Sequence, residues 1–214
     1  MQVTTTEATT SMDSPIAQAV QFLSTLSAKP PMPDAVVEAL LQAEKTAKQT
    51  KVYHSYSQLL GTWRLGFITG TKRSRQRAGV ILGSGRFLPR WVKVHLSYSS
   101  TANPLESQPE PSLERGIVQN SVEIGPLQIA LTGPTQFWSK KNILAFDFTR
   151  MKISLSGLKL YEGDIRGGKD RETCFSEPSL KKQAFFAYFL VQERCLAARG
   201  RGGGLALWTK VRDS

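Results

Sequence analysis

Short segments in which apolar and polar residues alternate occupy most of the chain after residue 60. In segment 92–98, valine, leucine and tyrosine alternate with lysine, histidine and serine, and a similar alternation occupies 118–124. A period of two residues places the apolar side chains on one face of a β-strand. We expect strands at Thr62–Thr69, Arg77–Leu82, Arg86–Tyr98, Gly116–Ile124, Leu127–Leu131, Gln136–Trp138, Ile143–Phe148, Lys152–Leu155, Lys159–Glu162, Ala184–Glu193, 195–199 and 204–211. A long series of short strands is typical of an antiparallel β-barrel, so the pattern predicts a mainly β protein of this kind.

Two of these segments are apolar on both faces. Phe185–Val191 contains only apolar residues, and Leu144–Phe148 is interrupted only by Asp147. A strand of a closed barrel buries one face, so another element must cover the outside of Phe185–Val191. If Asp147 is buried, it needs a cationic partner or hydrogen-bond donors.

The first fifty residues have the period of helices instead. Ser14 followed by Pro15 is typical of a helix start, and Asp34 is a candidate cap for a second helix. We expect this helical pair to cover the outside of the barrel. The expected divisions are a disordered tail at 1–12, a helical segment at 13–50 and a barrel domain at 51–214.

Two long connections separate predicted strands, at 99–113 and 163–182. The first contains three prolines, and the second is rich in glycine, serine and charged residues. Connections of this length are more often functional or disordered than incidental.

The charge is positive and unevenly distributed. The 214 residues carry a net charge of +11, whereas residues 1–50 hold five carboxylates against three lysines, so the remainder carries +13. A basic barrel can bind an anionic lipid surface or a nucleic acid. The densest basic segment lies between two predicted strands and contains Lys72, Arg73, Arg75 and Arg77. We predict that these four residues contact a membrane surface.

Catalytic and metal-binding signatures are missing from the sequence. His54 and His95 have no ligands at metal-site spacing, and Cys174 and Cys195 form no Cys-x-x-Cys pair. The chain is therefore expected to be a non-enzyme without metal or cofactor. No apolar segment reaches the roughly 20 residues of a membrane-spanning helix. The first 28 residues lack lysine and arginine, so we expect neither a signal peptide nor a transit peptide.

Two motifs frame the strand-rich region. The first is Leu60–Leu65, which contains Gly61 and Trp63. The second is the glycine-rich segment 198–211, which contains Arg199, Gly200, Gly203 and Lys210. A large indole can plug the end of a barrel, and a glycine-rich hairpin can supply its last strands.

Taken together, these motifs resemble the plastid-lipid-associated protein family, also called plastid fibrillins, in its cyanobacterial form. The resemblance covers roughly residues 35 to 212. It departs from the family where an acidic pair usually precedes the closing segment, because this chain has Gln192-Glu193-Arg194-Cys195 there.

The resemblance implies a lipocalin-like antiparallel β-barrel with an N-terminal helical pair. It implies non-enzymatic binding of a lipophilic molecule, such as an isoprenoid lipid, quinone or carotenoid, at a thylakoid membrane or lipid globule. The expected location is peripheral, on the cytoplasmic side of a cyanobacterial thylakoid, or in a chloroplast for a mature plant form. By analogy with lipocalin-like barrels, we also expect Arg199 to lie over the ring of Trp63 at the barrel floor.

Two other functions stay open. Related barrels handle tetrapyrroles, so a bilin chromophore lyase or tetrapyrrole-binding chaperone is the first alternative. An RNA-binding module is the second, since the basic segment would suit phosphates. Nucleic acid is the less favoured partner, because the aromatic residues fall mostly in apolar strands rather than among the basic residues.

Overall fold

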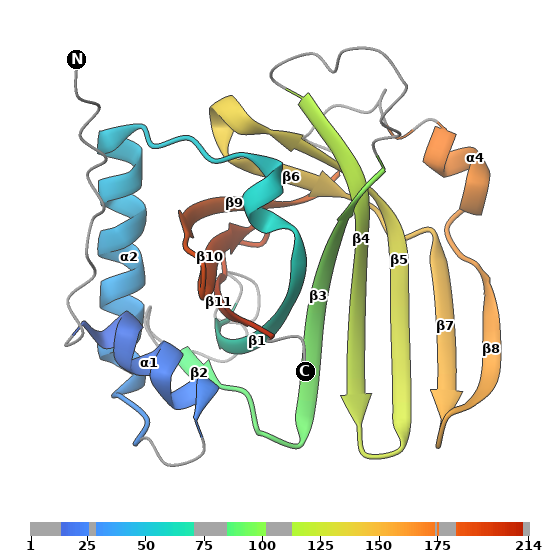
Figure 1. Cartoon of the computed structure of the whole chain (residues 1–214), viewed down its shortest axis with the longest axis horizontal. Coiled ribbons are helices and arrows are strands. Elements are labelled where there is room, and N and C mark those ends of the chain that lie inside the picture. The colour runs from blue at the N-terminus through green and yellow to red at the C-terminus, as the bar shows by residue number, and fades with distance from the viewer. Residues whose placement is uncertain are drawn as a thin grey trace.

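The computed structural model describes residues 14–25, 29–70, 85–101, 113–173, 175 and 183–211. The protein is mainly β, with a closed eight-stranded antiparallel barrel and two N-terminal helices, as the sequence predicted (Figure 1). The strands are β1 (Gly61–Thr69), β2 (Gly85–Phe87), β3 (Val92–Ser100), β4 (Leu113–Ile124), β5 (Leu127–Trp138), β6 (Ile143–Phe146), β7 (Arg150–Leu155), β8 (Leu158–Asp164), β9 (Ala184–Val191), β10 (Cys195–Gly200) and β11 (Leu205–Lys210). The helical elements are α1 (Pro15–Ser24), α2 (Pro33–Thr50), α4 (Gly168–Thr173) and the 3-10 turns η1 (Tyr56–Leu59) and η2 (Ser139–Lys141).

The barrel closes because its first and last strands pair. The order around it is β4, β3, β1, β11, β10, β9, β6 and β5, and β5 pairs back onto β4. Trp63 on β1 lies directly opposite Lys210 on β11. The predicted glycine-rich hairpin is confirmed, since β10 and β11 pair along their length and Gly203 N–H donates to the carbonyl of Gly200 at 2.8 Å.

The sheet divides at the segment 147–149, which we call the fork. Along one edge of β5, the first half pairs with β7 and the second half with β6. Between β6 and β7 the register slips by one residue, as in a β-bulge. On its far side β6 continues the barrel through β9, whereas β7 pairs with β8 and leaves the barrel.

Strand β5 corrects the prediction of two separate strands at 127–131 and 136–138. A single strand runs through Gly133 and Pro134. The carbonyl of Pro134 accepts from Asp147 N–H, so the missing N–H of this proline faces the fork, where no regular ladder is interrupted. At Gly133 a Cβ atom would collide with the carbonyl oxygen of Asp147, which explains the glycine.

The remaining strand predictions agree with the structure within a few residues, with two exceptions. The predicted strand 86–98 is divided into β2 and β3 by a turn at 88–91. The predicted strand Arg77–Leu82 lies outside the described residues.

Aromatic side chains fill the barrel interior. Trp63, Tyr98, Phe137, Phe146, Tyr188 and Trp208 belong to one buried cluster. The hydroxyls of Tyr98 and Tyr188 share a hydrogen bond of 2.7 Å, and Trp63 Nε1–H donates to the carbonyl of Leu59 at 2.7 Å. Trp63 is fully buried against η1, in keeping with the predicted plug.

The helical pair covers the outer face of the barrel, as predicted. Ile16, Val20, Val36 and Leu40 pack in one buried cluster with Phe189 and with outward residues of β1, β10 and β11. Ser14 caps α1 by accepting from Ala17 N–H at 3.2 Å. Asp34 does not cap α2; Met32 occupies the cap position without a side-chain bond, because Pro33 takes the first helical position.

An ion pair joins the helical layer to the barrel. Arg199 on β10 points outward, and its guanidinium donates from Nε to Glu44 Oε1 at 2.9 Å and from Nη2 to Glu44 Oε2. Its Nη1 donates to the carbonyl of Gly203 at 2.6 Å. These hydrogen bonds from Arg199 hold the pKa of the Glu44 carboxyl below its usual value.

The expected contact between Arg199 and Trp63 is wrong. Trp63 faces the barrel interior. Arg199 lies on the outer face of β10, together with Ala197 and Cys195, because alternate residues of a strand share a face. The cation over the indole is Lys210, whose Nζ lies 4.9 Å from the ring centroid. Opposite strand residues share a face, so the pairing of Trp63 with Lys210 explains this choice.

The Glu44–Arg199 pair predicts an acid-dependent stability. Glu44→Gln should lower the free energy of unfolding at neutral pH by about 2 kcal/mol, because the charged hydrogen bonds are lost. The pKa of Glu44 is lowered in the folded state, so this stabilisation is complete above the unfolded carboxyl's pKa and is lost as the pH falls through the folded value. The difference between parent and variant should therefore shrink below about pH 4.

Urea unfolding at several pH values measures this difference. The matched control is Glu38→Gln on the exposed side of the same helix. Equal stability of parent and Glu44→Gln at pH 7 would contradict the role of the pair.

Candidate apolar binding surface

Beyond the fork, five strands continue as an open sheet. We call this part the wing: residues 92–96 of β3, 120–124 of β4, 127–132 of β5, 150–155 of β7 and 158–164 of β8. Figure 1 shows the wing extending to one side of the barrel. The ladders from β3 through β7 contain no register shift, so the face that lines the barrel interior continues across the wing.

The wing is strongly amphipathic. Side chains opposite one another on paired strands form cross-strand rows on one face. The two rows nearest the free end of the sheet are Val92, Ile124, Leu127, Leu155 and Leu158, then Val94, Val122, Ile129, Ile153 and Tyr161. The outermost row on the opposite face is Lys93, Glu123, Gln128, Ser154 and Lys159. We call the ten-residue surface the apolar wing face.

The apolar wing face is only partly covered within the described residues. Neither of the two buried clusters described above includes any of its ten residues. Ile124, Leu155, Leu158 and Tyr161 are exposed and the other six are half-buried. An antiparallel sheet normally packs its apolar face on a core, so a contiguous apolar face of this kind marks an interaction site.

A buried polar atom lies where the apolar wing face meets the barrel core. Asn120 is in the third row, between Leu96 and Leu131. Its Oδ1 is buried and has no hydrogen-bond partner in the described part of the protein. A buried acceptor without a partner costs about 1–3 kcal/mol, so this position is suited to a ligand that brings a donor.

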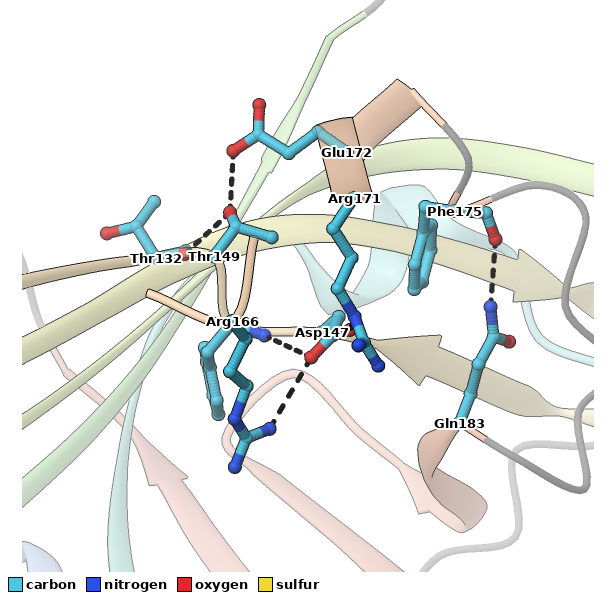
Figure 2. Close-up of polar contacts among 9 residues, drawn as sticks. Thr132, Asp147, Thr149, Arg166, Arg171, Glu172, Phe175 and Gln183 are labelled. Carbon is cyan, nitrogen blue, oxygen red and sulfur yellow. Dashed lines mark hydrogen bonds and ion pairs between the residues drawn. The ribbon is translucent and has the colours of Figure 1, made fainter. Parts of the chain in front are cut away.

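The opposite, outer side of the fork carries a polar cluster (Figure 2), and an open cavity adjoins it. Asp147 is almost fully buried, and Arg171 Nε donates to its Oδ2 while Arg166 Nη1 lies 3.5 Å from its Oδ1. Thr149 Oγ1 donates to Glu172 Oε1 at 2.6 Å. The predicted need of Asp147 for cationic partners is therefore confirmed.

These contacts fix α4, which follows the wing, beside the fork. Arg171 and Glu172 belong to α4, within the connection predicted at 163–182, and they bind the two ends of the fork. The adjoining cavity has a volume of about 470 Å³ and is lined by Arg115, Gln136, Arg150, Glu172 and Phe175, among others. Arg150 Nε lies 3.5 Å from Glu172 Oε1 and 3.8 Å from Asp164 Oδ1, so its charge is compensated within the protein. The cluster supports the fold.

The residues predicted from the family motifs lie in structural positions. Gly61 has a φ of 108°, and a Cβ there would lie 3.3 Å from Lys210 Cε. Gly200 and Gly203 form the turn between β10 and β11, and Lys210 covers Trp63. None of these residues lines the apolar wing face. The predicted membrane contacts Lys72, Arg73, Arg75 and Arg77 lie outside the described residues.

Burial shifts the pKa of three residues that the sequence analysis considered for catalysis or metal binding. Burial raises the pKa of the Cys195 thiol to about 11, so the nucleophilic thiolate is disfavoured at neutral pH. Burial also lowers the pKa of His54 and of His95. Among the described residues, no group of three histidine, cysteine, aspartate or glutamate side chains could hold a metal ion.

The wing was missed in the sequence because its strands look like other barrel strands. Its signal is present in the alternation of 92–98 and 118–124, and it continues in Ile129, Ile153 and Tyr161. The wing differs from the barrel because β7 pairs with β8, whereas β6 pairs with β9. The alternation of apolar and polar residues does not reveal which strand a given strand pairs with.

No protein-family model matches the sequence, and no curated protein matches it. The resemblance to plastid fibrillins therefore stays a prediction. Among the residues that the structure describes, no helix has both the length and the apolar character needed to cross a bilayer.

Proposed function

We propose that this protein binds a lipophilic small molecule, without catalysis, on the apolar wing face. One observation carries the proposal: the face that lines the barrel core continues onto an open sheet as two complete rows of apolar residues. Removing apolar surface from water contributes about 25 cal/mol for each Å² to binding, before the costs of association are subtracted. The packed aromatic core favours this open face over the barrel interior as the ligand site.

Asn120 supplies the polar feature that such a site uses to orient its ligand. Apolar sites commonly hold one or a few polar groups that fix the position of the bound molecule. With Asn120 at the inner end and the exposed first row at the outer end, an elongated amphipathic ligand would place its polar group near Oδ1 and its tail along the rows.

The proposed setting is the surface of a membrane or lipid globule. The net charge of +11 supports attraction to anionic lipids, and the basic residues Lys72, Arg73, Arg75 and Arg77 are the contacts proposed from the sequence. A thylakoid surface and an isoprenoid lipid, quinone or carotenoid ligand follow from the family resemblance and are part of the same proposal.

Mass spectrometry of an organic-solvent extract tests the proposal directly. The protein should be purified without detergent, and its extract compared with that of an unrelated basic β-protein prepared in the same way. A lipophilic compound present only with this protein would support the function and identify the ligand. A protein free of lipids that also fails to bind a fluorescent fatty acid would argue against it.

A charged substitution in the second row should weaken ligand binding. Ile129→Glu places a carboxylate in the apolar wing face, and we expect the dissociation constant for cis-parinaric acid to increase by about tenfold, which corresponds to 1.4 kcal/mol. The matched control is Gln128→Glu, because adjacent strand residues point to opposite faces. Fluorescence titration in vesicle-free buffer measures both, and equal binding by the two variants would exclude this face as the site.

Replacing Asn120 should separate stability from specificity. Asn120→Leu removes a buried acceptor without a partner, so the melting temperature should rise by about 2–4 °C for each kcal/mol gained. In this variant the affinity for decanol relative to decane, measured by displacement of the same probe, should be about three- to tenfold lower than in the parent. Only the alcohol can donate a hydrogen bond to Asn120 Oδ1. An unchanged ratio of decanol to decane affinity would contradict the role of Asn120.

A further inference from the structure

Large apolar side chains gather at the free end of the wing. Five of them are more than a third exposed: Trp91 by 67%, Ile124 by 45%, Leu155 by 42%, Leu158 by 73% and Leu160 by 62%. We call this set the wing tip. Single exposed apolar residues are common on soluble proteins, but a contiguous group of them marks a contact surface.

The members of the wing tip come from separate chain segments and reach the same end of the sheet. Ile124 precedes the β4–β5 turn, Leu155 and Leu158 flank the β7–β8 turn, and Trp91 precedes the first residue of β3. Val92, Ile124, Leu155 and Leu158 share one cross-strand row, so the register itself aligns these segments. Figure 1 shows both hairpin turns at this end of the wing.

The polar residues beside the wing tip favour an anionic partner. Segments 90–95, 121–128 and 152–162 carry four cations, Arg90, Lys93, Lys152 and Lys159, against two carboxylates, Glu123 and Glu162. Lys93 lies 3.4 Å from Glu123, Lys159 lies 2.8 Å from Glu162, and Arg90 Nη2 donates to the carbonyl of Thr25 at 3.2 Å. Counted over these three segments, cations exceed carboxylates by two. Basic groups near the surface strengthen binding to anionic lipids.

We propose that the wing tip inserts into the interfacial region of an anionic bilayer, with Trp91 at the level of the lipid headgroups. The wing tip brings apolar side chains from several chain segments to one end of the sheet, and a planar, deformable surface can contact all of them at once. Tryptophan favours the boundary between water and hydrocarbon. This assignment rests on the proposed function only in its choice of lipid as the partner. It opens the outer end of the apolar wing face directly to the membrane.

A second copy of the chain is the competing partner. Strand β8 is an edge strand of the sheet and could pair with β8 of another molecule. Such a pair would leave Trp91 and Ile124 exposed, because β3 and β4 lie on the far side of β5 and β7. The bilayer accounts for all members of the wing tip, and the dimer accounts only for those on β8.

Tryptophan fluorescence with brominated lipids tests the insertion. The chain has four tryptophans; Trp63 and Trp208 are buried, Trp138 is half-buried, and Trp91 is exposed. Vesicles of equimolar phosphatidylcholine and phosphatidylglycerol with brominated acyl chains should quench the full-length protein, and Trp91→Phe should abolish most of that quenching. No ligand is added in this experiment.

Co-sedimentation with the same lipids provides the second measurement. Leu158→Ser/Leu160→Ser should lower the partition coefficient by at least about tenfold, since interfacial binding scales with the apolar area inserted. Met32→Ser/Leu41→Ser, at exposed apolar positions before and on α2, is the matched control and should bind as the parent does.

The other outcomes overturn the inference. Binding without quenching of Trp91 would place the membrane contact elsewhere, for example at residues 72–77. A dimer that Leu158→Ser/Leu160→Ser dissociates, together with absent quenching, would make a second copy the partner. Because the probe titrations described above use no vesicles, a failed ligand proposal and a failed insertion proposal give different results.

Discussion

A β-strand has only two edges, and this limit determines the architecture at β5. One edge of β5 is used in full by β4, and the other is divided between β7 and β6. The chain can continue the barrel and build the wing only because β6 and β7 turn to different partners beyond the fork. Gly133 allows the carbonyl oxygen of Asp147 to approach the backbone of β5 closely. Pro134 lacks an N–H, but it lies at the fork, where no regular ladder needs that donor. Asp147 and Thr149 bind α4 through their side chains.

The consequence for function is that one continuous face experiences two environments. Within the barrel the face is sealed by opposing strands and filled by aromatic rings such as Trp63, Tyr188 and Trp208. On the wing, the ten residues of the apolar wing face lie outside both buried clusters of the described residues. The proposed ligand site thus requires no empty barrel. It requires only that the apolar pattern of β3, β4 and β5 continue beyond the point where the barrel closes.

Features that depend on neighbouring residues could be predicted from the sequence, whereas contacts between distant residues could not. The cap at Ser14, the glycine-rich hairpin and the cover over Phe189 all depend on neighbouring residues or on one strand's two faces. The contact of Arg199 with Glu44 requires that the Arg199 side chain point outward and that a helix residue 155 positions away in sequence lie beside it. The motif analogy contains neither fact, so it predicted a contact with Trp63 instead. Asn120 could not be recognised as unusual, because an asparagine in a strand reveals nothing about whether its amide finds a partner.

The pairing of the first barrel strand with the last also governs how the protein is made. Trp63 is synthesised roughly seven to thirty seconds before its partner Lys210 at the usual rates of elongation. During that interval β1 lacks one neighbour, and the helices α1 and α2 lack the outer surface of β9, β10 and β11 on which they pack. The apolar surface that these elements share is therefore buried only after the last strands of the chain have been made.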